Sequence, residues 1–66
     1  MQTNKAQKLQ AAGFRSQGDL FIRPVRDQHT MPGWQLVVSI DANRITLEDA
    51  HGREKQSHAI DWDQIQ

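Results

Sequence analysis

The stretch WQLVVSI, residues 34–40, indicates the fold that the rest of the chain completes. Large apolar side chains stand at every second position, namely Trp34, Leu36, Val38 and Ile40, and smaller or polar side chains fill the positions between them. An alternation with a period of two is typical of a strand that is buried on one face. We therefore expect a sheet built around this strand, with Trp34 in the core and the other elements covering the apolar face.

The segments after residue 40 predict an antiparallel meander. Asn43 can take the left-handed backbone conformation that a tight hairpin needs, and Gly52 can do the same in a second hairpin. These two turns leave room for strands over residues 45–48 and 54–60. On the last strand we expect His58 to lie, partly buried, on the apolar face.

The segments before residue 34 predict a connector, a further strand and a long loop. Glycines on both sides of residues 14–18 favour an irregular connector, and the apolar run LFIRPV favours a strand over residues 20–25. Pro24 has no N–H to donate to a neighbouring strand, so this strand is expected at a sheet edge or with a bulge. The loop RDQHTMPG, residues 26–33, leads into the central strand, and loops of this kind often carry binding residues.

The N-terminal segment predicts a short helix. Residues 1–13 contain mostly good helix formers, with Thr3 or Asn4 available as the N-cap and a glycine at the end. A helix of this length is marginal alone, so it must dock on the sheet, bind a partner or fray. We expect it to dock through Leu9 and Phe14.

These segments predict a single small domain of all 66 residues, mainly β in an α+β arrangement. The helix occupies residues 1–13 and the β meander residues 18–65. The meander ends in one helical turn, which Asp61 caps and which folds Trp62 and Ile65 back on the sheet. Four to five antiparallel strands of this length either close into a small barrel or stay open as a curled sheet with the helix across one face.

The size of the chain limits its core. A domain of 66 residues buries only about 60% of the surface of its unfolded chain. Apolar residues make up 36% of the sequence and cysteine is absent, so no disulfide can staple the fold. Domains near this size often gain stability by association, which makes a homo-oligomer formed through a strand edge or an apolar face an open alternative.

The composition also excludes several classes of protein. No apolar run approaches the roughly 20 residues of a membrane span, and the N-terminus lacks the apolar core of a signal peptide, so we expect a cytoplasmic protein with no membrane contact. The three histidines, His29, His51 and His58, follow no metal-binding spacing, and Asp61 and Asp63 are better explained as turn residues than as a catalytic pair. With no nucleophile–base pair and no glycine-rich phosphate loop, the chain is predicted to be a non-enzyme with no metal and no other cofactor.

Charge is divided unevenly along a chain whose formal net charge is zero. Residues 1–26 carry five basic residues against Asp19 alone, a net charge of +4, and residues 27–66 carry three basic against seven acidic residues, a net charge of −4. Such asymmetry can mark a basic patch for an anionic partner. The alternative is a mixed solvated surface, in which the charges of the two halves interleave once the sheet folds.

Five stretches from Gly18 to Ile65 follow the layout of a known family of small barrels. They are GDLFIRPV, RDQHTMPG, GWQLVVSID, RITLEDAHG and HAIDWDQI. In this order of strand, long first loop, hairpin-linked meander and closing one-turn helix, the chain resembles SH3-like barrels of the KOW and Tudor kind. The resemblance implies a non-enzymatic adaptor that binds nucleic acid, a peptide or a protein surface.

The leading functional hypothesis is a small regulatory or accessory module that contacts nucleic acid. The residues expected to bind it are Arg15, Phe21, Arg23, Arg26 and His29. Phe21 and Arg23 would project from the same strand face, where the ring can stack on a base while the guanidinium contacts a phosphate. Otherwise Phe21 belongs to the core and Arg23 is a solvated edge charge that discourages aggregation.

The competing hypothesis is a protein-interaction module or a small inhibitor. A meander that does not close leaves backbone donors and acceptors along its edges, where a partner strand or a second copy of the chain, giving a homodimer, can add. Salt separates the two hypotheses, because binding to nucleic acid weakens steeply as salt rises. Pairing at a sheet edge is instead expected to tolerate salt.

Overall fold

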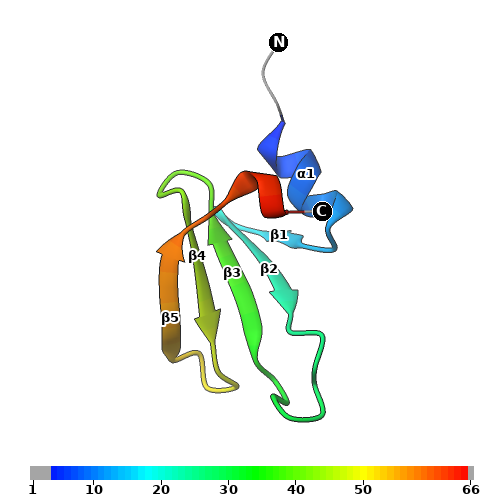
Figure 1. The fold of residues 1–66 in the computed structure, drawn as a ribbon, viewed down its shortest axis with the longest axis vertical. Helices are drawn as coiled ribbons and strands as arrows, with labels where there is room; N and C mark the ends of the chain where they lie inside the picture. The colour runs from blue at the N-terminus through cyan, green and yellow to red at the C-terminus, as the bar shows by residue number, and fades with distance from the viewer. Residues whose placement is uncertain (1–3, 66) are drawn as a thin grey trace.

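The computed structural model describes residues 4–65, which form an open antiparallel sheet with one helix across the end of one face (Figure 1). Its elements in chain order are the α-helix α1 (Lys5–Ala11), the strands β1 (Arg15–Gln17), β2 (Leu20–Pro24), β3 (Gln35–Ser39), β4 (Arg44–Glu48) and β5 (Glu54–Ala59), and the 3-10 helix η1 (Trp62–Gln64). The strands lie side by side in the order β1-β2-β3-β4-β5. β1 and β5 are therefore the two edges, and of the two arrangements expected for the meander this is the open one.

The register of the strands divides the sheet into two faces. One row of paired residues across β2 to β5 consists of Phe21, Val38, Ile45 and His58. Side chains alternate between the faces of a sheet, so the row two residues further along lies on the same side. That second row consists of Arg23, Leu36, Leu47 and Gln56. We call the side that carries both rows the front face, because α1 and η1 pack on it, and the opposite side the back face.

The helix α1 begins and ends as its sequence predicts. Asn4 is the N-cap, and its side-chain oxygen accepts a hydrogen bond from the N–H of Gln7 at 3.0 Å. Gly13 takes a positive φ of 95°, and the N–H of Phe14 then donates to the Leu9 carbonyl at 2.9 Å. The other predicted cap, Thr3, lies outside the described residues. The turn after α1 places Leu9 and Phe14 against the sheet, so the predicted docking of the helix is confirmed.

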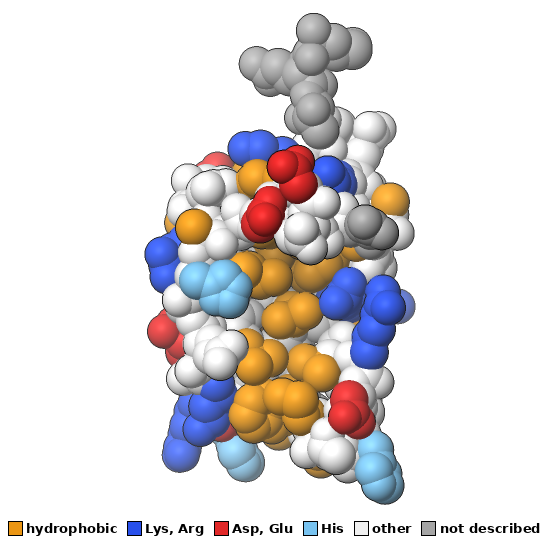
Figure 2. All heavy atoms as spheres, in the orientation of Figure 1, with side chains coloured by type: hydrophobic (Ala, Val, Ile, Leu, Met, Phe, Trp, Pro, Cys, Tyr) orange, Lys and Arg blue, Asp and Glu red, His pale blue; other side chains and the backbone are white. Residues whose placement is uncertain are grey.

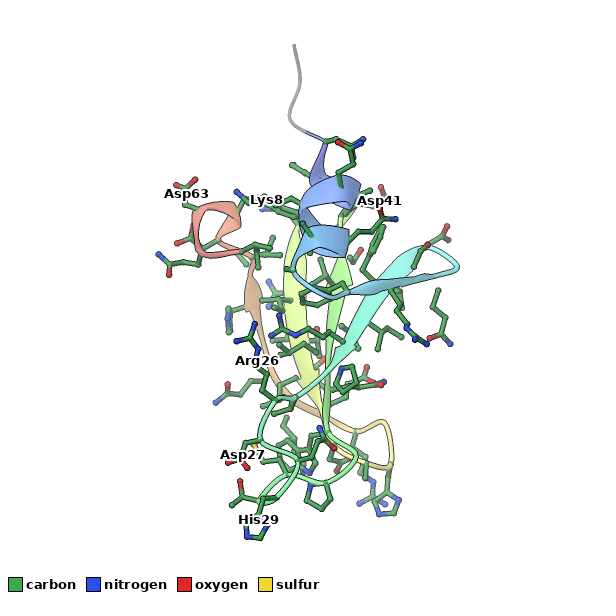
Figure 3. All side chains as sticks on the ribbon, turned by 90° about the vertical axis from the view of Figure 1, so that its right-hand side faces the viewer. Lys8, Arg26, Asp27, His29, Asp41 and Asp63 are labelled. Atoms are coloured by element: carbon green, nitrogen blue, oxygen red, sulfur yellow. The ribbon has the colours of Figure 1, made fainter. Side chains whose placement is uncertain are left out.

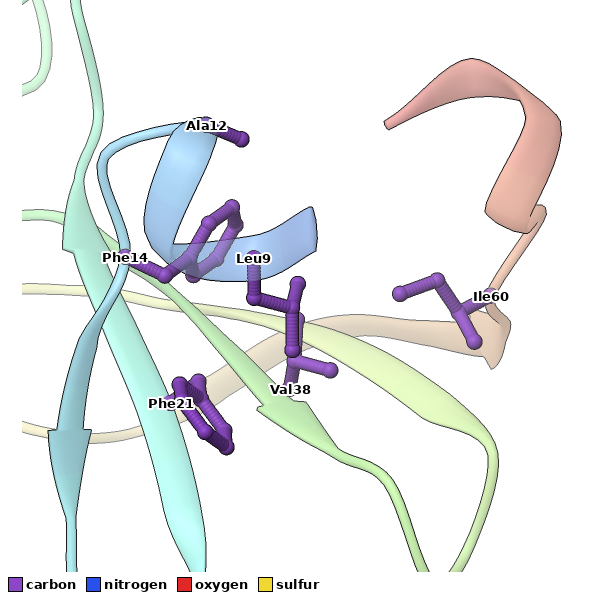
Figure 4. Packing of buried hydrophobic residues seen from close by; sticks show 6 residues of the cluster. All are labelled: Leu9, Ala12, Phe14, Phe21, Val38 and Ile60. Atoms are coloured by element: carbon purple, nitrogen blue, oxygen red, sulfur yellow. The ribbon is translucent and has the colours of Figure 1, made fainter. Parts of the chain in front are cut away.

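The core is a small cluster between α1, the upper part of the sheet and the segment that leads into η1 (Figure 4). Leu9 and Val38 are fully buried, at 0% exposure, and they are the largest side chains buried to this degree. The other members of the cluster are Ala12, Phe14, Phe21 and Ile60. Trp62 of η1 and Ile65, the residue after η1, pack against it, which confirms that residues 62–65 fold back on the sheet.

The two hairpins on either side of β4 form as predicted. Asn43 has a φ of 56° and Gly52 a φ of 79°, the left-handed conformations that tight turns require. Asn43 also anchors the end of the chain, because its side-chain oxygen accepts a hydrogen bond from the indole N–H of Trp62 at 2.7 Å. Its carbonyl accepts a second bond from the N–H of Ile60 at 3.0 Å. One turn residue therefore joins β4 to η1.

Four details differ from the sequence-based expectations. Residues 15–17 form the strand β1 rather than an irregular connector, and they pair with residues 20–22 of β2. β2 is therefore an inner strand rather than an edge strand. Pro24 is compatible with this position because it lies beyond the end of β1, so no strand on that side needs the N–H that proline lacks. His58 does lie on the front face, but it is exposed, because β5 is an edge strand. Trp34 is only partly buried and is not part of the core cluster.

Asp49 organises the hairpin between β4 and β5. One oxygen of its carboxylate accepts hydrogen bonds from the N–H groups of His51 and Arg53, both at 2.9 Å, and the other lies 3.7 Å from the ammonium of Lys55. These bonds, led by the one from Arg53, hold the pKa of Asp49 below its ordinary value of 3.8. The folded protein therefore favours the charged carboxylate.

The lowered pKa of Asp49 predicts a loss of stability in acid. A group whose pKa is lower in the folded than in the unfolded state stabilises the fold at all pH values above its unfolded pKa, about 3.9, and this contribution is lost as pH falls through the folded pKa. We expect the free energy of unfolding to fall below pH about 4, and to fall less steeply in Asp49→Asn, which keeps an oxygen acceptor without the charge. Urea unfolding followed by tryptophan fluorescence at pH 6 and pH 3 measures this, and an equal pH dependence in the two proteins would contradict it.

Candidate functional site

The lower part of the front face is apolar and only partly covered. Leu36, Ile45 and Leu47 lie there by their strand pairing, and Trp34 follows because it stands two residues before Leu36, where its carbonyl accepts a hydrogen bond from the N–H of Val25 at 3.0 Å. All four have intermediate exposure, and we call them the apolar stripe. Leu36 and Ile45 pack on the margin of the core, whereas Trp34 and Leu47 lie beyond it. Figure 2 shows hydrophobic side chains continuing down the middle of this face, below the end of the chain. A contiguous apolar surface with polar sides is a feature of interaction sites.

The edge strand β5 borders the stripe on one side. Of its six residues only Ser57 is partly buried, and Gln56 and His58 are the ones that share the front face with the stripe. Within residues 4–65 no strand pairs with the outer edge of β5, so its backbone N–H and C=O groups there are available to an added strand. Apolar contacts and backbone hydrogen bonds are thus offered side by side.

The loop between β2 and β3 lies at the lower end of the sheet, below the stripe (Figure 1), and Gln28 holds its shape. The side-chain oxygen of Gln28 accepts a hydrogen bond from the N–H of Gly33 at 2.9 Å, and its side-chain nitrogen donates to the carbonyls of Val25 and, at 3.3 Å, Trp34. Asp27 accepts two further bonds from Thr30, at 3.2 Å from the N–H and 2.6 Å from the hydroxyl. This loop therefore has a defined conformation, held largely by its own side chains.

Arg23 stands at the upper end of the stripe and is fixed by contacts within the domain. Its guanidinium donates to the Ala12 carbonyl at 3.0 Å and lies 4.8 Å from the centre of the Phe14 ring, a cation–π distance. Its Nε is buried and has no hydrogen-bond partner among the described residues. Burial, and after it the charge of Arg26, lowers the pKa of Arg23 from its ordinary value. An arginine nevertheless stays charged at any physiological pH.

A cavity of about 380 Å³ opens between α1, η1 and the front face of the sheet. Its apolar walls are Ala12, Phe14, Leu36, Ile45 and Ile65, and its polar walls are Arg23, Arg26 and Gln64. In Figure 3 Arg26 projects to the same side of the sheet as η1. The two arginines therefore line one cavity whose floor is shared with the apolar stripe.

The five residues expected to bind nucleic acid do not form one surface. Phe21 is 8% exposed and belongs to the core, and Arg23 is partly buried rather than a solvated charge. Arg15 pairs with Ile22 in the sheet and so lies on the back face, and His29 is exposed in the β2–β3 loop, at the opposite end of the molecule from α1 (Figure 3). Of the five, Arg23 and Arg26 share the cavity.

Reasoning from the sequence missed the apolar stripe because it assigned the whole inward row to the core. A helix of seven residues is only about 10 Å long, whereas a five-residue strand spans about 17 Å. α1 can therefore cover one end of the row and must leave the other end open. The short length of the helix was the signal that could have identified the stripe.

Residues 4–65 contain neither a side-chain group suited to a metal ion nor a membrane-spanning helix. Within residues 4–65 no three side chains among His, Asp and Glu come together in a group that could hold a metal ion. The same part of the chain contains no helix long and apolar enough to cross a membrane.

Comparisons with known proteins assign no family to this chain. A scan against protein-family models, a search of curated proteins and a search of solved structures each gave no match. The function therefore has to be inferred from the geometry of the front face.

Proposed function

We propose that this chain is a non-enzymatic protein-interaction module that binds a segment of a partner protein across the apolar stripe. The observation that carries the proposal is the stripe itself: four large apolar side chains that α1 leaves partly exposed on one continuous surface. Covering apolar surface contributes about 25 cal/mol per Å² removed from water, so a partner that covers the stripe gains affinity from apolar surface that the domain alone leaves exposed.

The edge of β5 supports the same function. A partner segment that crosses the stripe on the front face can continue into an extended stretch that pairs with this edge. The residues of β5 are mostly polar, so the unpaired edge stays soluble until a complementary strand arrives. Backbone pairing would then fix the register of the partner, and the stripe would select its apolar side chains.

Nucleic acid is a second candidate partner, favoured by one observation. Arg23 and Arg26 place two positive charges at the upper end of the stripe, where phosphates could bind. The buried ring of Phe21 and the position of Arg15 on the back face remove two of the contacts expected for such a partner. The apolar stripe extends further than this cationic pair, so a protein partner is the better explanation of the surface as a whole.

Selection of peptides on the immobilised protein tests the proposal. We expect dodecamers from a random library to be enriched on the wild type, and to bind Leu47→Lys at least tenfold more weakly, because the new ammonium would be buried in an apolar contact. Thr46→Lys is the matched control: residue 46 is next in β4 but faces the back, so binding should change little.

Two results would contradict a protein-interaction function. One is the absence of any peptide that distinguishes the wild type from Leu47→Lys. The other is tight binding of a mixed-sequence DNA or RNA single strand that weakens steeply with salt and depends on Arg26. Sedimentation of the protein alone completes the test, since a dimer that Leu47→Lys dissociates would identify a second copy of the chain as the partner.

A further inference from the structure

Two kinds of side chain, apolar and cationic, line the cavity above the stripe. Phe14, Leu36, Ile45 and Ile65 give it apolar walls, and Arg23 and Arg26 give it two cations. Leu36 and Ile45 also belong to the apolar stripe, so the cavity is continuous with the surface proposed to bind a partner. A segment that lies along the stripe and runs towards α1 ends at this cavity.

Among residues 4–65 no acidic side chain forms an ion pair with the two cations of the cavity. The one ion pair in this part of the chain is between Lys55 and Asp49, in the hairpin of β4 and β5. Like charges held close together repel each other, and the buried Nε of Arg23 also lacks an acceptor. An anionic group that entered the cavity would relieve the repulsion and supply acceptors.

We propose that the cavity receives the C-terminal residue of a partner peptide, with its free carboxylate between Arg23 and Arg26 and its apolar side chain against Leu36, Ile45 and Ile65. The proposal rests on the proposed function and names the chemistry of the partner. A C-terminal residue carries a carboxylate and an apolar side chain on the same carbon, which matches a cavity with both kinds of wall. Guanidinium and carboxylate form strong, charge-assisted hydrogen bonds, often in pairs.

The cavity is large enough for a terminal residue. Its volume of about 380 Å³ lies at the low end of the about 300–1,000 Å³ of pockets that hold whole ligands. A phosphate of a nucleic acid would satisfy the two cations but would leave the apolar walls uncovered. Charge and shape together therefore favour a peptide end over a phosphate.

A titration with two small probes tests the proposal without any knowledge of the partner. N-acetyl-leucine carries the carboxylate and the apolar side chain, and N-acetyl-leucinamide differs only in lacking the charge. We expect the free acid to bind with a dissociation constant in the range of about 1–10 mM, and the amide about tenfold more weakly. Two-dimensional NMR should show the free acid moving the Nε–H signal of Arg23 and the methyl signals of Leu36 and Ile65.

Two arginine variants locate the charge effect. Arg26→Gln should weaken the free acid about tenfold and leave the amide nearly unchanged, because it removes only the charged contact. Arg15→Gln is the matched control, since Arg15 is an exposed arginine on the back face, and it should leave both affinities unchanged. Arg23 is unsuitable for substitution because its guanidinium also holds the Ala12 carbonyl.

Three results would overturn the proposal. They are equal affinity for the free acid and the amide, no change in Arg26→Gln, and inorganic phosphate producing the same shifts at the methyl groups of Leu36 and Ile65. A failure of the proposed function can be distinguished from these three results, because that function is tested by the effect of a substitution at Leu47 on peptide binding. Peptides that require Leu47 but bind equally well with free and amidated C-termini would retain the function and exclude the carboxylate site.

Discussion

Replacement of Leu9 by alanine is expected to destabilise the domain by about 3 kcal/mol. Leu9 is fully buried at the centre of the core cluster, between α1 and Val38 of the sheet. Removing a fully buried leucine side chain beyond its Cβ costs about 2–5 kcal/mol, the lost burial plus the cavity left behind. No other side chain of the seven-residue helix is fully buried, so the helix has no second buried side chain that could move into the cavity.

The loss is large relative to the stability of a domain of this size. At about 0.05–0.15 kcal/mol per residue, a chain of 66 residues is stable by on the order of 3–10 kcal/mol. Leu9→Ala is therefore expected to lower the melting temperature strongly and to populate the unfolded state at 37 °C. Circular dichroism and urea unfolding measure the effect, with Gln10→Ala, an exposed neighbour in α1, as the control. A loss below about 1 kcal/mol would contradict the docking of α1 on the sheet.

Gly33→Ala is expected to be the most destabilising glycine substitution, at about 3 kcal/mol. Gly33 has a φ of 79°, which strains a residue with a side chain by about 1–2 kcal/mol. In addition, a Cβ at this position would lie 2.8 Å from the Cβ of Ala50, closer than two carbon atoms can approach. The β2–β3 loop and the β4–β5 hairpin touch at this point, so the clash would push apart the two loops below the apolar stripe.

Gly52→Ala separates the backbone strain expected in Gly33→Ala from the clash with Ala50. Gly52 has the same φ of 79°, but nothing lies within 4 Å of a Cβ built there. It should therefore show the backbone strain alone, about 1 kcal/mol. The double variant Gly33→Ala with Ala50→Gly should recover part of the difference in urea unfolding. Equal losses for Gly33→Ala and Gly52→Ala would show that the contact with Ala50 has no energetic consequence.

Much of the fold could be predicted from local patterns. The alternation from residue 34 to 40 specifies β3, and Asn43 and Gly52 specify the hairpins, because few residues tolerate a positive φ. The strand β1 could not be predicted in this way, since Arg15, Ser16 and Gln17 are all exposed and carry no apolar alternation. β1 exists because Gly18, with a φ of 63°, turns the chain back so that these residues pair with β2.

The candidate site was harder to predict because it depends on contacts between distant segments. The orientation of Arg23 is set by the Ala12 carbonyl and the Phe14 ring, which only the docking of α1 brings to β2. The sequence shows that Phe21 and Arg23 share a strand face. It does not show that Phe21 is buried in the core beneath α1. The exposure of Trp34 and Leu47 depends likewise on where α1 and η1 end, which is a property of the packing.

The most direct test of the apolar stripe as a partner-binding surface is methyl NMR of the wild-type protein titrated with one selected peptide. Side-chain methyl signals report the two faces of the sheet separately, because neighbouring residues of a strand point to opposite sides. The proposed function predicts that the methyl signals of Leu36, Ile45 and Leu47 shift, while those of Ile22 and Val37 on the back face stay in place. Shifts confined to Ile22 and Val37 would contradict it.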